Sequence, residues 1–199
     1  MRGRRPEPSD PARSLVAMEL LVVRHAHAGA KDHWGGDDRL RPLSDRGRRE
    51  ALALVGQLAP YGPVRVLSSP LVRCLQTVGP LADHLGLAVE QSDALGPQAD
   101  REAARLVRSL TSAASTVVVC THGETIEALQ RRLARPGKLA FGPGGAHEKG
   151  STWLLHASAG RLTSATYLPP AVLLADGPPA HGAPAHGQRG GGAADPAEA

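Results

Sequence analysis

ELLVVRHAHAG, residues 19–29, passes from a short apolar run into a polar segment that carries one arginine and two histidines. Residues 19–23 predict a buried strand, because the run is short and apolar and is bounded by a charged residue. Residues 25–43 contain glycine, aspartate, proline and charged side chains, which predicts a long loop. A buried strand that ends in such a loop is typical of the parallel sheet of an α/β protein.

The rest of the chain alternates between strand-like runs and helical periodicity. Ser44 is a predicted helix N-cap, and apolar side chains from Ala51 to Leu58 follow it along one helical face. The β-branched run at residues 116–120 predicts a central strand. The other predictions are strands at 64–67 and 87–90, helices from Pro70 and at 100–112 and 123–134, and a closing hairpin with strands at 151–156 and 161–167.

This alternation predicts an α/β fold, a three-layer sandwich in which helices cover both faces of a mainly parallel mixed sheet. Gly79 and Pro80 fall inside the second predicted helix and are expected to kink or divide it. The predicted domain covers residues 18–168. Residues 1–17 form a basic leader and residues 169–199 are rich in proline, glycine and alanine, so we expect both to be disordered.

Charge and composition limit the possible partners. The net charge of +4 owes much to arginines in the leader, and the aromatic residues, 3% of the chain, are not interleaved with basic ones as in single-strand binding proteins. No stretch approaches the roughly 20 apolar residues that a membrane helix needs. Cys74 and Cys120 lie in apolar patterns and are expected to be buried thiols in a reducing compartment. We therefore predict a cytoplasmic protein without nucleic-acid or membrane partners.

Cationic and imidazole side chains follow three of the predicted strands. Arg24 and His25 come directly after the first strand. Arg73 lies one turn into the helix after the second strand, and His122 follows the central strand. Because ligands bind beyond the carboxyl ends of the strands in such sheets, we expect these four side chains to converge on one pocket.

A pocket with two arginines and two histidines suits a dianion. Arginine offers a fork of donors that matches phosphate oxygens, and predicted helix N-termini after Ser69 and His122 would add main-chain donors. A neutral histidine can attack phosphorus through a ring nitrogen, which requires neither a metal nor another cofactor. The residues therefore predict phosphoryl transfer to a histidine.

Three motifs, in this order, resemble those of the histidine phosphatase superfamily, which has a phosphoglycerate mutase-like fold. They are RHAHAG at 24–29, SSPLVRCLQT at 68–77 and VVVCTHGET at 117–125, and KGSTWLL at 149–155 extends the likeness. The set is similar to the small SixA-like branch and to the phosphatase domain fused to some bacterial Nudix hydrolases. The resemblance implies a metal-independent hydrolase with a phosphohistidine intermediate.

Position by position, the resemblance implies that His25 is the nucleophile and that Arg24 and Arg73 bind the phosphoryl oxygens. It also implies that His122 donates to the same oxygens and stabilises the transition state, and that His27 binds substrate at the pocket edge. The SixA-like likeness implies protein phosphohistidine as the substrate. The expected partner is thus a phosphorylated protein or a small phosphorylated metabolite.

Two departures from the family pattern bear on the expected substrate. Ala26 stands where the family usually has glycine, which is a mild change if the backbone there does not need a positive φ. Residues 93–100 lack the glutamate that donates a proton in many members, and Asp93, Asp100 or Glu102 are the candidates to replace it. A missing acid favours leaving groups that need little protonation, such as those of phosphohistidine or a nucleotide anhydride, over alcohols.

Other interpretations of the same residues stay open. The chain could hydrolyse a small nucleotide or metabolite phosphate, or it could be a phosphate-binding regulatory module without catalysis. His25 and His27, with His33 and Asp37 nearby, could hold a metal, although a metal would occupy the nucleophile. Lys149 belongs either to the pocket edge or simply to the start of a strand.

Overall fold

Strands and helices alternate along the chain as the sequence predicts. A computed structural model describes residues 18–112, 115–134, 139–141 and 147–172. The strands are β1 (Met18–Arg24), β2 (Arg65–Ser68), β3 (Val89–Gln91), β4 (Val117–Thr121), β5 (Thr152–Ser158) and β6 (Arg161–Leu168). The helices are α1 (Asp45–Leu58), α2 (Val72–Leu85), α3 (Asp100–Leu110) and α4 (Gly123–Leu133), with short 3-10 turns η1 (Asp38–Leu40), η2 (Ala59–Tyr61) and η3 (Asp93–Leu95).

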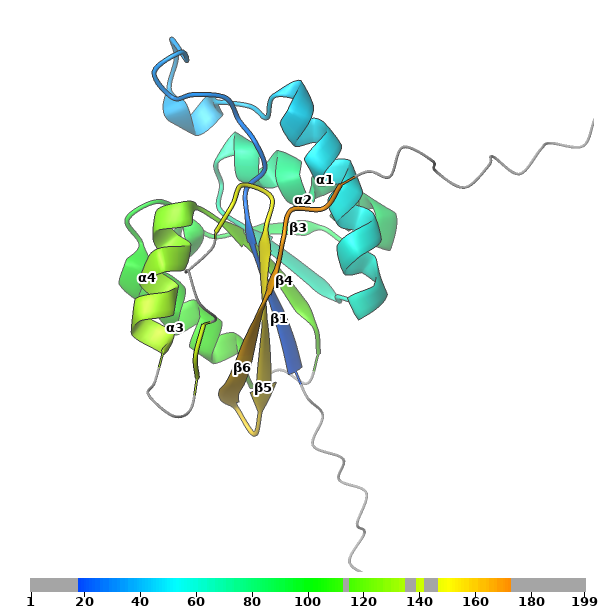
Figure 1. Ribbon diagram of the computed structural model, residues 1–199, viewed down its shortest axis with the longest axis vertical. Coiled ribbons are helices and arrows are strands. Elements are labelled where there is room, and N and C mark those ends of the chain that lie inside the picture. The colour runs from blue at the N-terminus through cyan, green and yellow to red at the C-terminus, as the bar shows by residue number, and fades with distance from the viewer. Residues whose placement is uncertain (1–17, 113–114, 135–138, 142–146, 173–199) are drawn as a thin grey trace, which may run out of the picture.

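The strands form a six-stranded sheet in the order β3-β2-β4-β1-β5-β6. The first four strands in this order pair in parallel, whereas β5 runs antiparallel to β1 and β6 runs antiparallel to β5. The sheet is therefore mixed and mainly parallel, as predicted. Figure 1 shows α1 and α2 on one side of this sheet and α3 and α4 on the other.

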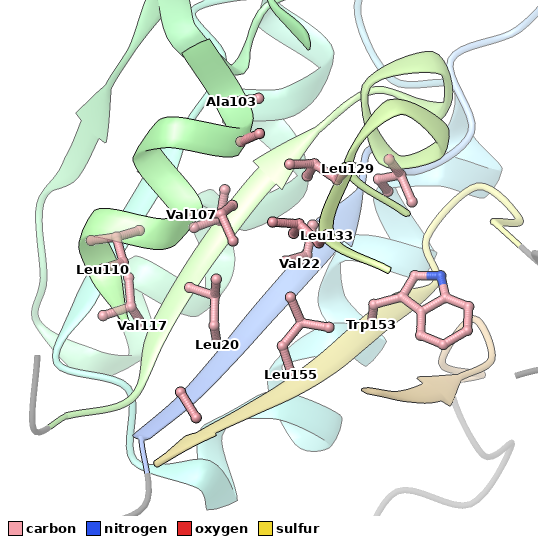
Figure 2. Close-up of a cluster of buried hydrophobic side chains, with 14 of the residues drawn as sticks. Leu20, Val22, Ala103, Val107, Leu110, Val117, Leu129, Leu133, Trp153 and Leu155 are labelled. Carbon is pink, nitrogen blue, oxygen red and sulfur yellow. The ribbon is translucent and has the colours of Figure 1, made fainter. Parts of the chain in front are cut away.

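Each face of the sheet has its own core, because successive residues of a strand point to opposite faces. Leu21 and Val23 of β1 belong to a buried cluster that α1 and α2 cover. Leu20 and Val22 belong to a second buried cluster, which includes Val107 of α3 and residues of α4 (Figure 2). The predicted three-layer architecture is thus confirmed.

The register of the parallel strands brings three strand ends to one edge of the sheet. All residues of β4 are buried, and the strand lies between β2 and β1, which confirms its predicted central position. Arg24 of β1 lies opposite Thr121 of β4, and Ser68 of β2 lies opposite Cys120 of the same strand. The carboxyl ends of β1, β2 and β4 therefore meet where ligands bind in such sheets.

The start of α1 packs directly against the residues that follow β1. Ser44 caps the helix, as predicted, because its side chain accepts a hydrogen bond from the main-chain N–H of Gly47. A Cβ atom at Gly47 would lie only 1.9 Å from the main-chain oxygen of His27. This close approach requires glycine, and it fixes α1 against the end of β1.

Of the two outcomes expected at Gly79 and Pro80, a kink or a division of the second helix, division is wrong, since Pro80 lies inside the single helix α2. Proline removes one main-chain hydrogen bond from a helix interior. Val78 and Leu81, on either side of the pair, are fully buried in the core between α2 and the sheet. This packing holds the helix together across the missing hydrogen bond.

The predicted closing hairpin is present as β5 and β6. Ala159 and Gly160 connect the two strands, and both have positive φ, 50° and 71° respectively. Two consecutive residues with positive φ are typical of the tight turn whose twist matches that of paired strands. Cys74 and Cys120 are free and buried, also as predicted.

Part of the sequence prediction lies outside the described residues. This applies to the basic leader, residues 1–17, and to residues 173–199 of the predicted tail. Among the residues that the structure describes, none of the helices combines the length and the apolar character needed to cross a membrane.

Candidate active site

His25 follows β1 directly and is held at the edge of the sheet by its main chain. Its N–H donates to the carbonyl oxygen of Thr121 over 3.0 Å, and its side chain is buried. The ring Nδ1 lies 2.8 Å from the carbonyl oxygen of Ala26. Because a carbonyl oxygen only accepts hydrogen bonds, Nδ1 carries the proton and Nε2 keeps a lone pair. The ring is therefore fixed in the tautomer that a nitrogen nucleophile needs.

The environment of His25 also keeps its ring neutral. Burial lowers its pKa from 6.5 to about 3, although the hydrogen bond to Ala26 opposes this shift. The positive charges of Arg73 and Arg24 act in the same direction as burial. A neutral imidazole near pH 7 is the form that can attack an electrophile.

His122 lies beside His25 at the N-cap of α4. The two ring centroids are 5.4 Å apart and the ring planes meet at 64°, so both imidazoles face the same space. Nε2 of His122 lies 2.9 Å from Oγ of Ser69, and Nδ1 lies 3.4 Å from Nη2 of Arg73. Because a guanidinium group only donates, Nδ1 of His122 is the acceptor, and Nε2 carries the proton that it donates to Oγ of Ser69.

Arg73, on α2, is buried and contacts the loop that follows β1. Its Nη1 donates to the carbonyl oxygen of Asp38 over 2.8 Å, and its Nη2 lies 3.3 Å from the Asp38 carboxylate. That carboxylate also accepts from Nε of Arg41 over 2.7 Å. Burial raises the pKa of Asp38, but the hydrogen bond from Arg41 and the charge of Arg73 hold it below its ordinary value. The ionised carboxylate of Asp38 therefore contacts the guanidinium group of Arg73, which an incoming anion would also need.

Arg24, the last residue of β1, lies against the start of α4. A Cβ atom at Gly123 would come within 2.8 Å of its Cζ atom, so the arginine can take this position only beside glycine. Its Nη1 donates to the carbonyl oxygen of His147. Burial lowers the pKa of Arg24, and the charge of Glu124 opposes that shift. Among the described residues, Nε of Arg24 and Nε of Arg73 are buried without a hydrogen-bond partner.

His27 stands apart from the other four predicted site residues. Its ring Nδ1 lies 2.7 Å from Oγ of Ser44, and its main-chain N–H donates to Oε2 of Glu50 over 2.8 Å. These contacts connect the segment after β1 to α1. His27 therefore contacts α1 rather than the two paired imidazoles, and its role at the pocket edge stays a prediction.

Ala26, the first departure from the family pattern, fits its position without strain. Its side chain is buried with Ala28, Leu43 and Ala51, and its main-chain N–H donates to Oγ1 of Thr77 over 2.9 Å. It is not among the described non-glycine residues with positive φ, in agreement with the expectation from the sequence. The extra methyl group thus fills an apolar contact.

The three candidate proton donors do not join the group of paired imidazoles and arginines. Asp93 begins η3, whereas Asp100 and Glu102 lie in the first turn of α3. No hydrogen bond or ion pair within the described ranges connects any of them to the arginines or histidines of the site. The segment approaches the site through its main chain instead, where the carbonyl oxygen of Leu95 accepts from Oγ1 of Thr121 over 2.7 Å.

The alternative metal site, drawn from His25, His27, His33 and Asp37, finds no counterpart in the geometry. In the part of the chain that the structure describes, no three or more histidine, cysteine or acidic side chains are grouped so that they could hold a metal ion. The ring of His27 is directed to Ser44, and that of His25 to its own neighbouring carbonyl.

Two polar residues of the site were not identified from the sequence. Asp38 lies in a loop without periodicity, 35 positions from the arginine that it contacts, so no pattern marks it. Ser69 had a usable signal, because a hydroxyl that directly follows a buried strand falls at the ligand-binding edge of the sheet. Both residues contact the phosphate-binding groups that the sequence predicts.

The fold places two imidazoles and two guanidiniums together at the strand ends of an α/β protein. Residues 20–97 match the model of the histidine phosphatase superfamily, branch 1. The chain is 39% identical over 167 residues to the 8-oxo-(d)GTP phosphatase of Mycolicibacterium smegmatis, an alignment that covers 79% of this chain and 50% of that protein. The chain belongs to the histidine phosphatase superfamily. It spans about half the length of this curated relative.

Solved structures of the same fold agree with the predicted architecture. The protein histidine phosphatase SixA in complex with tungstate has a TM-score of 0.61 at 24% identity, covering 76% of this chain and 94% of that one. A mycobacterial glucosyl-3-phosphoglycerate phosphatase has a TM-score of 0.56 at 19% identity, covering 76% and 97%. These likenesses establish the α/β phosphoglycerate mutase-like fold.

Proposed function

We propose that this chain hydrolyses the terminal phosphoryl group of a nucleotide phosphoanhydride, with His25 as the nucleophile and a phosphohistidine as the intermediate. The observation that carries the proposal is the ring of His25, which is neutral, keeps its lone pair on Nε2 and faces His122 at 5.4 Å. Arg24 and Arg73, whose buried Nε atoms lack partners among the described residues, would bind the phosphoryl oxygens.

The reaction proceeds in two displacements at phosphorus. First, Nε2 of His25 forms a bond to the terminal phosphorus, and the bond from phosphorus to the bridging oxygen breaks, so that the shorter nucleotide leaves with the electron pair. Water then attacks the phosphohistidine, the N–P bond breaks, and its electron pair returns to Nε2 as inorganic phosphate and a proton are released. The donors of Arg24 and Arg73 stabilise the charge on the equatorial oxygens in both steps, and His122 would add the N–H that it gives to Ser69.

The choice of an anhydride follows from the leaving group. An alkoxide needs a proton as it departs, whereas a nucleotide phosphate leaves as a stable anion. None of the three candidate acids contacts the paired imidazoles and arginines, which favours a substrate that does not need them. The relative from Mycolicibacterium smegmatis, named as an 8-oxo-(d)GTP phosphatase, supports the same substrate class.

Trapping the intermediate tests the mechanism. The protein is mixed with a nucleoside diphosphate that carries 32P in its terminal phosphate, with a chelator present, and quenched in alkali. We expect an acid-labile, alkali-stable label on the unsubstituted chain and none on His25→Ala. The matched control is His156→Ala on β5, whose ring lies 3.6 Å from Glu19 at the opposite end of β1 and which should retain the label. Label on His25→Ala, or phosphate binding without label on any variant, would contradict the mechanism.

Protein phosphohistidine is a second candidate substrate, because SixA shares the fold and the N–P bond also breaks without a strong acid. Parallel assays with 8-oxo-dGTP, GDP, a phosphohistidine protein and a phosphoserine peptide distinguish the two. We expect kcat/KM to be highest for the nucleotides. A higher value for the phosphohistidine protein would transfer the proposal to that substrate, and comparable turnover of the phosphoserine peptide would remove the argument from the leaving group.

A further inference from the structure

Lys149 directly precedes Gly150, whose main chain is hydrogen-bonded to the end of β1. The main-chain N–H of Gly150 is shared between the carbonyl oxygens of Arg24 and His25, each at 3.2 Å. The main-chain N–H of Arg24 in turn donates to the carbonyl oxygen of Ser151 over 2.9 Å. Lys149 is therefore held beside the nucleophile by its own backbone, and its side chain is only partly exposed.

The surroundings of Lys149 are dominated by positive charge. Burial lowers its pKa, and the charges of Arg24, Arg41 and Arg46 lower it further, whereas Glu50 alone acts in the opposite direction. Positive charges that lie near one another repel, and the repulsion is strongest where burial limits screening by water. The folded chain thus gathers cations at this border of the site at an electrostatic cost.

The nearby carboxylates are already bound to other cations. Glu50 accepts from Nε of Arg46 over 2.7 Å and from the main-chain N–H of His27 over 2.8 Å. Asp38 accepts from Nε of Arg41 over 2.7 Å. Within the described residues, no hydrogen bond or ion pair is made by the ammonium group of Lys149. The positive charge of Lys149 is therefore left without a partner there, within electrostatic reach of Arg24, one of the groups proposed to bind the transferred phosphoryl group.

His27 lies within electrostatic reach of the same cations, which favour its neutral form. Burial lowers its pKa, and the charges of Lys149, Arg46 and Arg41 add to this effect against Glu50. The residue predicted to bind substrate at the pocket edge is therefore within electrostatic reach of Lys149.

We infer that Lys149, with Arg24 and His27 beside it, forms a second anion subsite that binds the phosphate next to the transferred one. This subsite rests on the proposed function and makes it specific. A diphosphate group would occupy both subsites, whereas a single phosphoryl group would leave the ammonium group of Lys149 without a partner. It distinguishes nucleotide anhydrides from protein phosphohistidine, which carries one phosphoryl group only. Lys149 is thus a specificity-determining residue rather than a member of the reacting group.

Competitive inhibition of p-nitrophenyl phosphate hydrolysis measures the subsite without any nucleotide. The two probes are methylenediphosphonate, which offers two phosphonates and resists hydrolysis, and methylphosphonate, which offers one. We expect the unsubstituted chain to bind the diphosphonate at least about tenfold more tightly, the scale of a charge-assisted contact. In Lys149→Met, this preference should fall to less than about threefold, and Lys149→Arg should keep most of it.

Arg161→Met is the matched control, since it also replaces one cation by methionine, but Arg161 is the first residue of β6, beside the β5–β6 turn at the far end of the sheet. It should leave the preference unchanged. An unsubstituted chain that binds both probes equally, or a Lys149→Met variant that keeps the full preference, would overturn the subsite. Failure of the nucleotide assays would be a separate result, because inhibition by the two probes does not require that any nucleotide is hydrolysed.

Discussion

Replacing His25 with asparagine should make the folded protein less sensitive to acid. In the folded chain, burial lowers the pKa of His25 from 6.5 to about 3, so the ring stays neutral over most of the acidic range. In the unfolded chain, the same ring takes up a proton as the pH falls below its ordinary value. The unfolded state then binds more protons than the folded state, and the free energy of unfolding decreases as the pH falls from about 6.5 towards 3.

The size of the effect follows from the same two values. Each pH unit inside this window removes about 1.4 kcal/mol of stability for one such group. Between pH 7 and pH 5, the contribution of His25 to the decrease is therefore about 2 kcal/mol. Asparagine has no titrating ring, and its amide N–H can still donate to the Ala26 carbonyl. Between pH 7 and pH 5, the free energy of unfolding of His25→Asn should therefore decrease by about 2 kcal/mol less than that of the unsubstituted chain, whatever the stability of the variant at neutral pH.

Urea unfolding at pH 7 and pH 5 measures the difference for each variant. His33→Asn is the control, because His33 is exposed, and its decrease between the two pH values should match that of the unsubstituted chain. If the free energy of unfolding decreases equally for His25→Asn and the unsubstituted chain between pH 7 and pH 5, then burial does not keep the His25 ring neutral. His25 would then not be prepared as a neutral nucleophile.

Three further substitutions test contacts of the site. Asp38→Asn removes a negative charge beside the phosphate-binding arginine of α2, so orthovanadate should inhibit about tenfold more strongly in assays with p-nitrophenyl phosphate. Gly123→Ala places a methyl group 2.8 Å from Cζ of Arg24, and kcat/KM should fall by about 100-fold or more while the circular dichroism spectrum is retained. Gly47→Ala places a methyl group 1.9 Å from the main-chain oxygen of His27, so urea unfolding should show a loss of about 2–4 kcal/mol.

Each of these substitutions has a control of the same chemical kind. Asp37→Asn removes a neighbouring negative charge that touches only the main chain of η1, and inhibition by vanadate should change less than about twofold. Gly79→Ala, in α2, has open space around the new methyl group and should keep the activity. Gly56→Ala, in α1, also has open space and should stabilise the helix by about 0.5–1 kcal/mol. Controls that behave like the test variants would show that the contacts named above are not the cause.

The sequence was sufficient for the arrangement of strand ends because its strongest patterns are set by burial. The run at residues 116–120 begins with four β-branched residues and is apolar after Thr116, which predicts a strand covered on both faces, and β4 lies between β2 and β1. Once that strand is central, the residues after the three strand runs must share one edge. The meeting of Arg73 and His122 could be expected from topology alone.

Features that depend on packing between distant segments could not be predicted in the same way. The local rule that proline interrupts a helix failed at Pro80, because the burial of its neighbours is a property of the folded chain. The contact between Asp38 and Arg73 joins a loop of mixed composition to a helix, and a loop has no period from which its path could be derived. The charge around Lys149 likewise arises from three segments that are far apart in the sequence.

The atoms that hold His25, the proposed nucleophile, come from segments that lie far downstream of it in the sequence. One neighbour is the carbonyl group of Thr121, and the other is the N–H group of Gly150. Contacts this distant along the chain form late in folding and slow it. During synthesis on the ribosome, the proposed nucleophile is therefore made long before the segments that hold it, and the proposed site can be complete only after the β5–β6 hairpin has been made and has docked.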